Sequence, residues 1–145
     1  MKQILLALVC FFSVQAMAWT DEDKPITVSQ LPQAAQQFIK KHFASHKVAL
    51  AKMDHDIFNK SYDVIFTNGD KIEFEGNGKW SEVKCPKNGV PGAIVPEQIK
   101  NYVQNHYKGT KILSIEKDKT TYEVKLSNNF ELKFNKGFKL MDIDR

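Results

Sequence analysis

The sequence predicts an α+β protein of two tandem repeats, each a helix followed by a four-stranded antiparallel sheet. Three observations predict this class. The second half of the chain repeats the first, each half opens on a helical stripe of apolar residues, and the rest of each half alternates apolar and polar residues. We expect the two sheets to be joined or abutted, with both helices packed on one sheet face and the other face exposed to solvent.

The composition is that of an ordinary folded protein. The chain has 145 residues, of which 42% are hydrophobic and 26% are charged, and its net charge is +4. These values exclude a disordered or collagen-like chain. The positive charge raises the question of nucleic acid, but the lysines are interleaved with acidic residues and the only arginine is Arg145. Because bidentate recognition of bases and phosphates prefers arginine, we exclude nucleic acid as a partner.

The first 18 residues have the parts of a secretory signal peptide. Lys2 gives a positive start, residues 4–12 form an unbroken apolar run, and residues 16–18 (Ala-Met-Ala) form a small-x-small cleavage site. The apolar run is too short to span a bilayer of about 30 Å. We predict cleavage between Ala18 and Trp19, a periplasmic or secreted mature protein, and no transmembrane segment.

The internal similarity is a series of short matching blocks in the same order. Leu31-Pro32 aligns with Val95-Pro96 and, after a deletion of about four residues in the second half, Tyr62-Asp63-Val64 aligns with Tyr122-Glu123-Val124. A cluster of proline, glycine and asparagine separates the halves and indicates a linker. The predicted first repeat, linker and second repeat are residues 19–85, 86–94 and 95–145.

Each half begins with a short predicted helix. Pro32 and Pro96 stand at the start, where a proline in the first turn is tolerated. Apolar residues then recur at the i, i+3, i+4 and i+8 spacing of one buried helix face. The two stripes are Ala35, Phe38, Ile39 and Phe43 in the first half, and Ile99, Tyr102, Val103 and Tyr107 in the second. Gly109 ends the second helix.

The remainder of each half predicts strands with one buried and one wet face. Tyr62 and Val64 point to one face, whereas Asp63 and Ile65 point to the other. Tight turns are indicated where asparagine or lysine precedes glycine, as at Asn68-Gly69. The predicted strands are residues 48–57, 61–67, 70–75, 79–84, 111–117, 121–127, 130–135 and 138–143.

With these features the sequence resembles the PepSY-like, β-lactamase-inhibitor-like proteins exported by Bacteroides-type bacteria. The resemblance covers about residues 25–145 and rests on the signal peptide, the two units, and their matching helix openings and tyrosine-containing strands. It implies a sheet surface that docks onto another protein, because PepSY modules are associated with the restraint of peptidases. The open face predicted for this chain is charged, whereas the inhibitor that lends the family its name presents an aromatic-rich sheet.

Our leading hypothesis is a non-enzymatic exported protein-binding module that inhibits a peptidase or other hydrolase, docking through its sheet face or hairpin turns. The alternatives are a cell-envelope adaptor or self-associating homo-oligomer, and a small-ligand carrier with a pocket between helices and sheet. Four residues lie opposite the core-facing strand positions and are the predicted partner contacts: Ile65, Glu73, Lys125 and Lys133.

We predict no catalytic residue, no metal site and no cofactor, because the sequence has no known catalytic or nucleotide-binding motif. His42 and His106 occupy matching helix positions, and we interpret them as boundary residues of the apolar stripes. Residues 54–56 (Asp-His-Asp) are the densest titratable cluster, but neighbouring strand residues point to opposite faces and cannot converge on one ion. Cys85 has no identifiable base and is interpreted as a passive thiol, with covalent dimerisation as the alternative.

Overall fold

The computed structural model describes residues 23–145, so the predicted signal peptide and its cleavage site lie outside the described residues. Two short helices are present in this part of the chain, α2 (Gln33–His42) and α3 (Glu97–His106), with a 3-10 turn η2 (Val28–Gln30). The strands are β1 (Lys24–Ile26), β2 (Val48–His55), β3 (Lys60–Phe66), β4 (Lys71–Glu75), β5 (Trp80–Lys84), β6 (Ile112–Lys117), β7 (Thr121–Leu126), β8 (Glu131–Asn135) and β9 (Leu140–Asp144).

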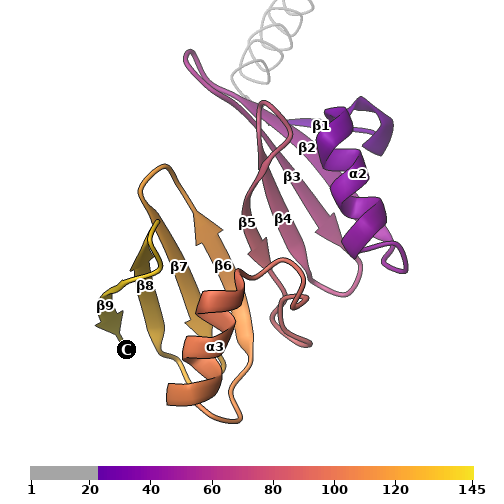
Figure 1. Cartoon of the computed structure of the whole chain (residues 1–145). Coiled ribbons are helices and arrows are strands. Elements are labelled where there is room, and N and C mark those ends of the chain that lie inside the picture. The colour runs from indigo at the N-terminus through magenta and orange to yellow at the C-terminus, as the bar shows by residue number, and fades with distance from the viewer. Residues whose placement is uncertain (1–22) are drawn as a thin grey trace, which may run out of the picture.

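All nine strands belong to one antiparallel sheet, in the order β1 to β9 (Figure 1). The predicted fold class, α+β with two tandem helix-plus-four-strand repeats, is therefore wrong: the molecule is dominated by a single sheet with two short helices. The pairing of β5 with β6 overturns the prediction, with Val83 opposite Ile115 at its centre. A free strand edge exposes backbone N–H and C=O groups, and pairing these two edges satisfies them.

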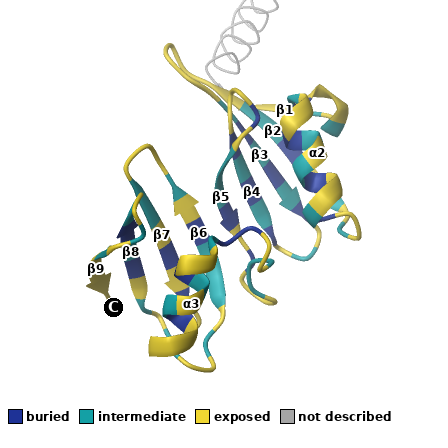
Figure 2. Cartoon of the chain, viewed as in Figure 1, coloured by how far each residue is buried: buried dark blue, intermediate teal, exposed yellow. Residues whose placement is uncertain are grey.

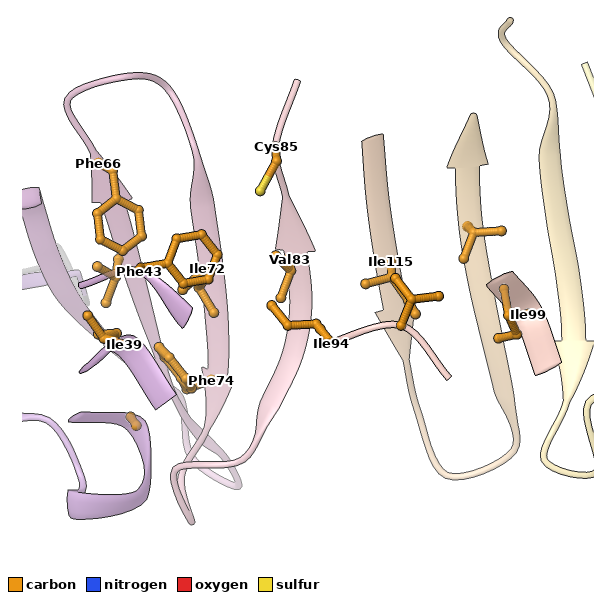
Figure 3. Packing of buried hydrophobic residues seen from close by; sticks show 14 of the residues in the cluster. Ile39, Phe43, Phe66, Ile72, Phe74, Val83, Cys85, Ile94, Ile99 and Ile115 are labelled. Atoms are coloured by element: carbon orange, nitrogen blue, oxygen red, sulfur yellow. The ribbon is translucent and has the colours of Figure 1, made fainter. Parts of the chain in front are cut away.

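The join between β5 and β6 is also a join between apolar side chains (Figure 3). Val83 and Ile115 are both 0% exposed, and Ile94, from the segment predicted as a linker, is buried near them. Their burial gives one continuous core across the sheet, since removing apolar surface from water is the main favourable term in folding. The division of the chain at residues 86–94 stays a prediction.

Both helices lie on the same side of the sheet, α2 beside the strands of the first half and α3 beside those of the second half (Figure 1). They bury Ala35 and Ile39 from α2, and Ile99 and Val103 from α3. The predicted alternation is visible along β3 as buried and half-buried positions (Figure 2). We call the surface that neither helix covers the open face. Among residues 23–145, no helix is long and apolar enough to cross a membrane.

Candidate partner-binding surfaces

The β2–β3 hairpin projects further than the β6–β7 hairpin. The pair Met53↔Tyr62 matches Lys117↔Tyr122, which is the last pair of the β6–β7 ladder. Two further pairs extend β2–β3, and these are Asp54↔Ser61 and His55↔Lys60. At about 3.4 Å per residue, the extra pairs carry this turn about 7 Å further from the sheet. The length difference seen in the sequence is therefore a longer hairpin.

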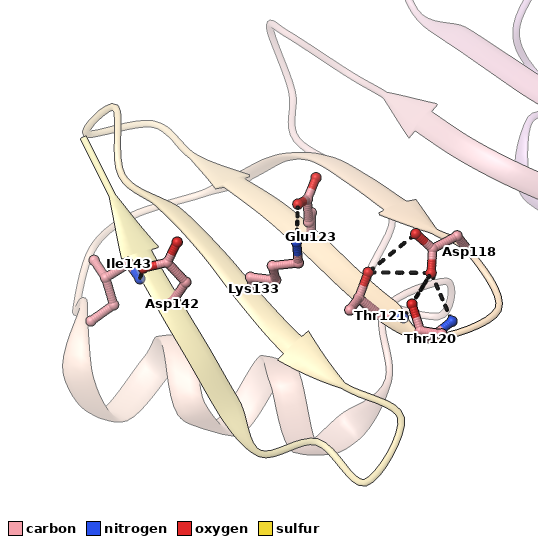
Figure 4. A network of polar contacts seen from close by, with 7 residues as sticks. All are labelled: Asp118, Thr120, Thr121, Glu123, Lys133, Asp142 and Ile143. Carbon is pink, nitrogen blue, oxygen red and sulfur yellow. Dashed lines mark hydrogen bonds and ion pairs between the residues drawn. The ribbon is translucent and has the colours of Figure 1, made fainter.

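The two hairpins end in the same type of turn. Asp56 Oδ1 accepts hydrogen bonds from the N–H groups of Asn59 (2.6 Å) and Phe58 (2.9 Å). Asp118 Oδ1 accepts from the N–H groups two and three residues on, at 2.7 and 2.8 Å (Figure 4). These bonds favour the ionised carboxylates, so they lower the pKa of Asp56 and lower that of Asp118 to about 2. Both turns are thus held by a carboxylate brace.

The residues displayed by the two turns differ in chemistry. Ile57 and Phe58 stand in the first turn and are each 89% exposed, more than any other large hydrophobic residue among residues 23–145. The second turn has Lys119 and Thr120 in the same places. Because the braced turn forms equally well with polar residues, its geometry does not require an apolar pair. We call Ile57 and Phe58 the apolar tip.

A row of four glutamates crosses the open face on β4, β5, β6 and β7. They stand directly opposite one another in the strand register and form what we call the carboxylate row: Glu73, Glu82, Glu116 and Glu123. Burial and then the neighbouring carboxylates raise the pKa of Glu73 and Glu116. Lysines partly offset the row, with Lys84 Nζ 3.2 Å from Glu82 and Lys133 Nζ 3.5 Å from Glu123. Like charges in register destabilise a sheet, so the row favours a cationic neighbour.

The four predicted partner contacts lie on the open face but do not form one cluster. Ile65 and Glu73 are half-buried on β3 and β4, whereas Lys125 and Lys133 lie on β7 and β8, with β5 and β6 between the two pairs. A hollow of about 510 Å³ lies over these central strands and includes Lys125 and Leu113 in its lining. Their role as partner contacts stays a prediction.

The titratable candidates from the sequence, His42, His106 and residues 54–56, do not come together in one site. His106 Nδ1 lies 2.9 Å from the carbonyl oxygen of Tyr102 and its ring stacks on that side chain, while the ring of His42 lies against Phe38 on the other helix. Burial lowers the pKa of His42. The carboxylate of Asp56 accepts a hydrogen bond from the backbone N–H of Asn59 in the hairpin turn. Within residues 23–145, no group of three or more His, Cys, Asp or Glu side chains is arranged to hold a metal ion.

The single cysteine of the described residues is buried. Cys85 is 1% exposed, and burial together with the nearby carboxylate of Asp70 raises the pKa of its thiol to about 12. The nucleophile is the thiolate, which such a pKa suppresses at neutral pH. Cys85 is therefore placed as a packing residue, next to the β5–β6 join (Figure 3).

Sequence reasoning missed the apolar tip and the carboxylate row. The predicted strand at residues 48–57 extended into the turn and therefore included Ile57. The signal that could have found the tip is the difference in hairpin length, combined with two apolar residues between Asp56 and Asn59. The carboxylate row had no such signal, because it depends on the pairing of β5 with β6.

Comparisons with known proteins agree with this fold. The family model described as "Putative beta-lactamase-inhibitor-like, PepSY-like" matches residues 12–57 and 60–142. A crystal structure from Bacteroides thetaiotaomicron, described as a "putative calcium-regulated periplasmic protein", is 58% identical with a TM-score of 0.85, covering 86% of this chain and 98% of that one.

Two structures from Bacteroides vulgatus are also similar. A periplasmic protein of the DUF2874 family is 59% identical with a TM-score of 0.84, over 87% of this chain and 99% of that one. A periplasmic protein of unknown function is 34% identical with a TM-score of 0.80, over 85% of this chain and 99% of that one. No curated protein matches the chain. The resemblance inferred from the sequence is confirmed, and the chain belongs to the PepSY-like, beta-lactamase-inhibitor-like family.

Proposed function

We propose that this protein is a non-enzymatic binding module of the periplasm that restrains a peptidase or another hydrolase by covering its surface. Membership of an inhibitor-like family and the periplasmic relatives support this proposal. The observation that carries it is the apolar tip, in which Ile57 and Phe58 are each 89% exposed on a braced, projecting turn.

The apolar tip has the properties of an interface anchor. A few aromatic and aliphatic side chains that fill pockets supply most of the binding energy of an interface. Complete burial of a side chain such as Phe58 contributes about 1.5–3 kcal/mol. The Asp56 brace orders the turn before binding, which reduces the entropy lost when the complex forms.

The open face supplies the polar part of the proposed interface. The predicted contacts Ile65, Glu73, Lys125 and Lys133 lie on it, together with the carboxylate row. Charges of this kind contribute more to partner choice and association rate than to affinity. The glutamates of the row, Glu73 and Glu116 above all, favour a partner with a basic surface opposite the centre of the sheet.

The calcium regulation attributed to the Bacteroides thetaiotaomicron protein is not carried over to this chain. Calcium takes six to eight oxygen ligands that surround the ion. The carboxylate row has suitable oxygen donors, but they lie in a line across four strands, and residues 23–145 contain no converging group of three or more acidic, histidine or cysteine side chains. No step of the proposed function uses a calcium ion.

The test is affinity capture from a Bacteroides periplasmic extract. The double variant Ile57→Lys/Phe58→Thr gives the first turn the residues of the second, and the reciprocal variant Lys119→Ile/Thr120→Phe is the matched control. We expect the wild-type protein and the control to capture a hydrolase, and the tip variant to lose at least nine-tenths of it. Lys125→Glu tests the open face in the same assay.

Two results would overturn the proposal. Equal capture of the hydrolase by the wild type and the tip variant would show that the tip does not contribute to the interface. Recovery of the protein itself and no hydrolase would favour a self-associating protein of the cell envelope.

A further inference from the structure

Strands β5 and β9 occupy comparable places but have different surroundings. Val83 on β5 stands opposite Ile72, and Ile143 on β9 stands opposite Leu132, so both side chains are on the helix-covered side of the sheet. Val83 is 0% exposed, whereas Ile143 is 46% exposed. The difference arises because Ile115 of β6 lies beyond Val83, while β9 is the last strand of the described sheet.

The backbone shows the same difference. Directly after β5, the Cys85 N–H donates to the carbonyl oxygen of Leu113 on β6 at 2.8 Å. Directly after β9, the Arg145 N–H donates to Oδ1 of the preceding Asp144 at 2.8 Å. The Ile143 N–H likewise donates to Oδ1 of Asp142 at 3.0 Å (Figure 4). The outward N–H groups of Ile143 and Arg145 are therefore satisfied by local side chains, which an incoming strand can displace.

The two edges of the sheet are not equivalent. At the other edge, β1 has only three residues, and its central residue is Pro25, which has no N–H to donate. Short strands and prolines are the usual protection of a sheet edge. Strand β9 has five residues and no proline, and it exposes 58% of Met141 as well as part of Ile143.

The charge beside β9 is negative. A small hollow of about 100 Å³ on the open face lies next to this strand. Its lining contains four carboxylates and one lysine: Glu123, Glu131, Asp142, Asp144 and Lys133. A strand added outside β9 would place its side chains opposite Asp142 and Asp144 on this face, and basic side chains complement that charge.

We propose that the outer edge of β9 binds an extended, basic segment of another protein as a tenth antiparallel strand. In that segment an apolar residue faces Ile143 on the helix-covered side, and its two neighbours are basic and face Asp142 and Asp144. Pairing with β9 of a second copy is disfavoured, because it brings the aspartates of both copies together. This surface is separate from the apolar tip and does not depend on the proposed inhibition.

The probe is a peptide copied from β6, since β6 is the strand that covers the comparable edge of β5. It has the sequence of residues 111–117 with lysine in place of Ser114 and Glu116, the residues that face Lys84 and Glu82 in the sheet. The control peptide has glutamate at both places. Binding to the predicted mature chain (residues 19–145) is measured at low salt by fluorescence anisotropy. We expect the basic peptide to bind at least tenfold more tightly than the acidic one.

Two variants locate the binding. The substitution Ile143→Pro removes an N–H that points away from β8, so the hydrogen bonds between β8 and β9 are kept. We expect it to weaken binding of the basic peptide at least tenfold. The double variant Asp142→Lys/Asp144→Lys should reverse the preference between the two peptides. If the proline variant has a lowered melting temperature, its loss of binding could come from destabilisation, and the double variant then provides the test of the site.

Equal affinity for both peptides, or binding that neither variant changes, would overturn the proposal. The tip variant Ile57→Lys/Phe58→Thr should bind the basic peptide as the wild type does. A loss of peptide binding in that variant would place the peptide at the tip and contradict the assignment to β9.

Discussion

Asp70 Oδ2 lies 3.3 Å from His46 Nε2, where the loop after α2 meets the turn between β3 and β4. The side chain of Asp70 is 3% exposed, and the amide of Asn68 donates a further hydrogen bond to it at 3.1 Å. The imidazole packs edge-on against the rings of Phe43 and Phe66. A buried carboxylate is tolerated only when such partners replace water, so this polar pair holds the chain between β3 and β4 against the aromatic core.

Replacement of Asp70 measures how much the Asp70–His46 pair contributes to the free energy of unfolding. Asp70→Ala leaves the facing atoms of His46 and Asn68 without their acceptor, so we expect the free energy of unfolding to fall by about 2–3 kcal/mol. Urea denaturation measures the change. Asp23→Ala is the control, because its ion pair with Lys52 (3.0 Å) is exposed to solvent and should contribute little to stability. Equal small effects of the two substitutions would contradict this account of the core.

The thiol of Cys85 should be unreactive in the folded protein. Its thiol is buried and has a pKa raised to about 12, so almost none is present as thiolate at pH 8. We expect a thiol reagent such as dithionitrobenzoate to label it at least a hundredfold more slowly in buffer than in urea. Rapid labelling of the folded protein, or a reducible dimer on a gel, would show that the thiol is accessible.

Removal of charge from the carboxylate row should stabilise the sheet. The folded state raises the pKa of Glu116, so it binds a proton more readily than the unfolded state, whose ordinary value is 4.5, and stability falls as pH rises through the raised pKa. We expect Glu116→Gln to raise the free energy of unfolding by about 0.5 kcal/mol at pH 8 and to have no such effect below pH 4.5.

Thermal unfolding at both pH values measures this difference. Glu97→Gln is a suitable control, since Glu97 lies 3.0 Å from Lys100 on α3 and is not in the row. A loss of stability in Glu116→Gln at pH 8 would mean that the row is already neutralised.

The turn between β4 and β5 should be sensitive to a single methyl group. Gly78 has a φ of +84°, and a Cβ there would lie 2.9 Å from Cβ of Pro32 at the start of α2. Gly69 has a φ of +93° but open space around it. Chemical denaturation should show a loss of about 2 kcal/mol for Gly78→Ala and about 1 kcal/mol for Gly69→Ala. Equal losses would show that α2 does not press on this turn.

The local elements could be predicted from the sequence because their periodicity is set by one face of burial. The stripe around Ala35 and Ile39 predicts α2, and the alternation of Tyr62, Val64 and Phe66 predicts β3. In both cases the apolar spacing records which side chains must leave water, and that requirement does not depend on distant parts of the chain.

The arrangement of the elements could not be predicted in the same way. The alternation in β5 and β6 is identical whether their edges are free or paired with each other, so the sequence could not distinguish two repeats from one continuous sheet. Strand β1 is too short for any period, and Pro25 argues against a strand at that place. The apolar tip follows no period because it lies outside the core, and only the comparison of the two hairpins identifies it.

The central claim is that the apolar tip anchors a complex that restrains a hydrolase. The most direct measurement is the activity of the captured hydrolase, titrated with the wild-type protein and with Ile57→Lys/Phe58→Thr. We expect a saturable loss of activity with the wild type, and at least a tenfold higher concentration of the tip variant for the same loss. Full hydrolase activity at a saturating concentration of wild-type protein, or equal inhibition by both proteins, would contradict it.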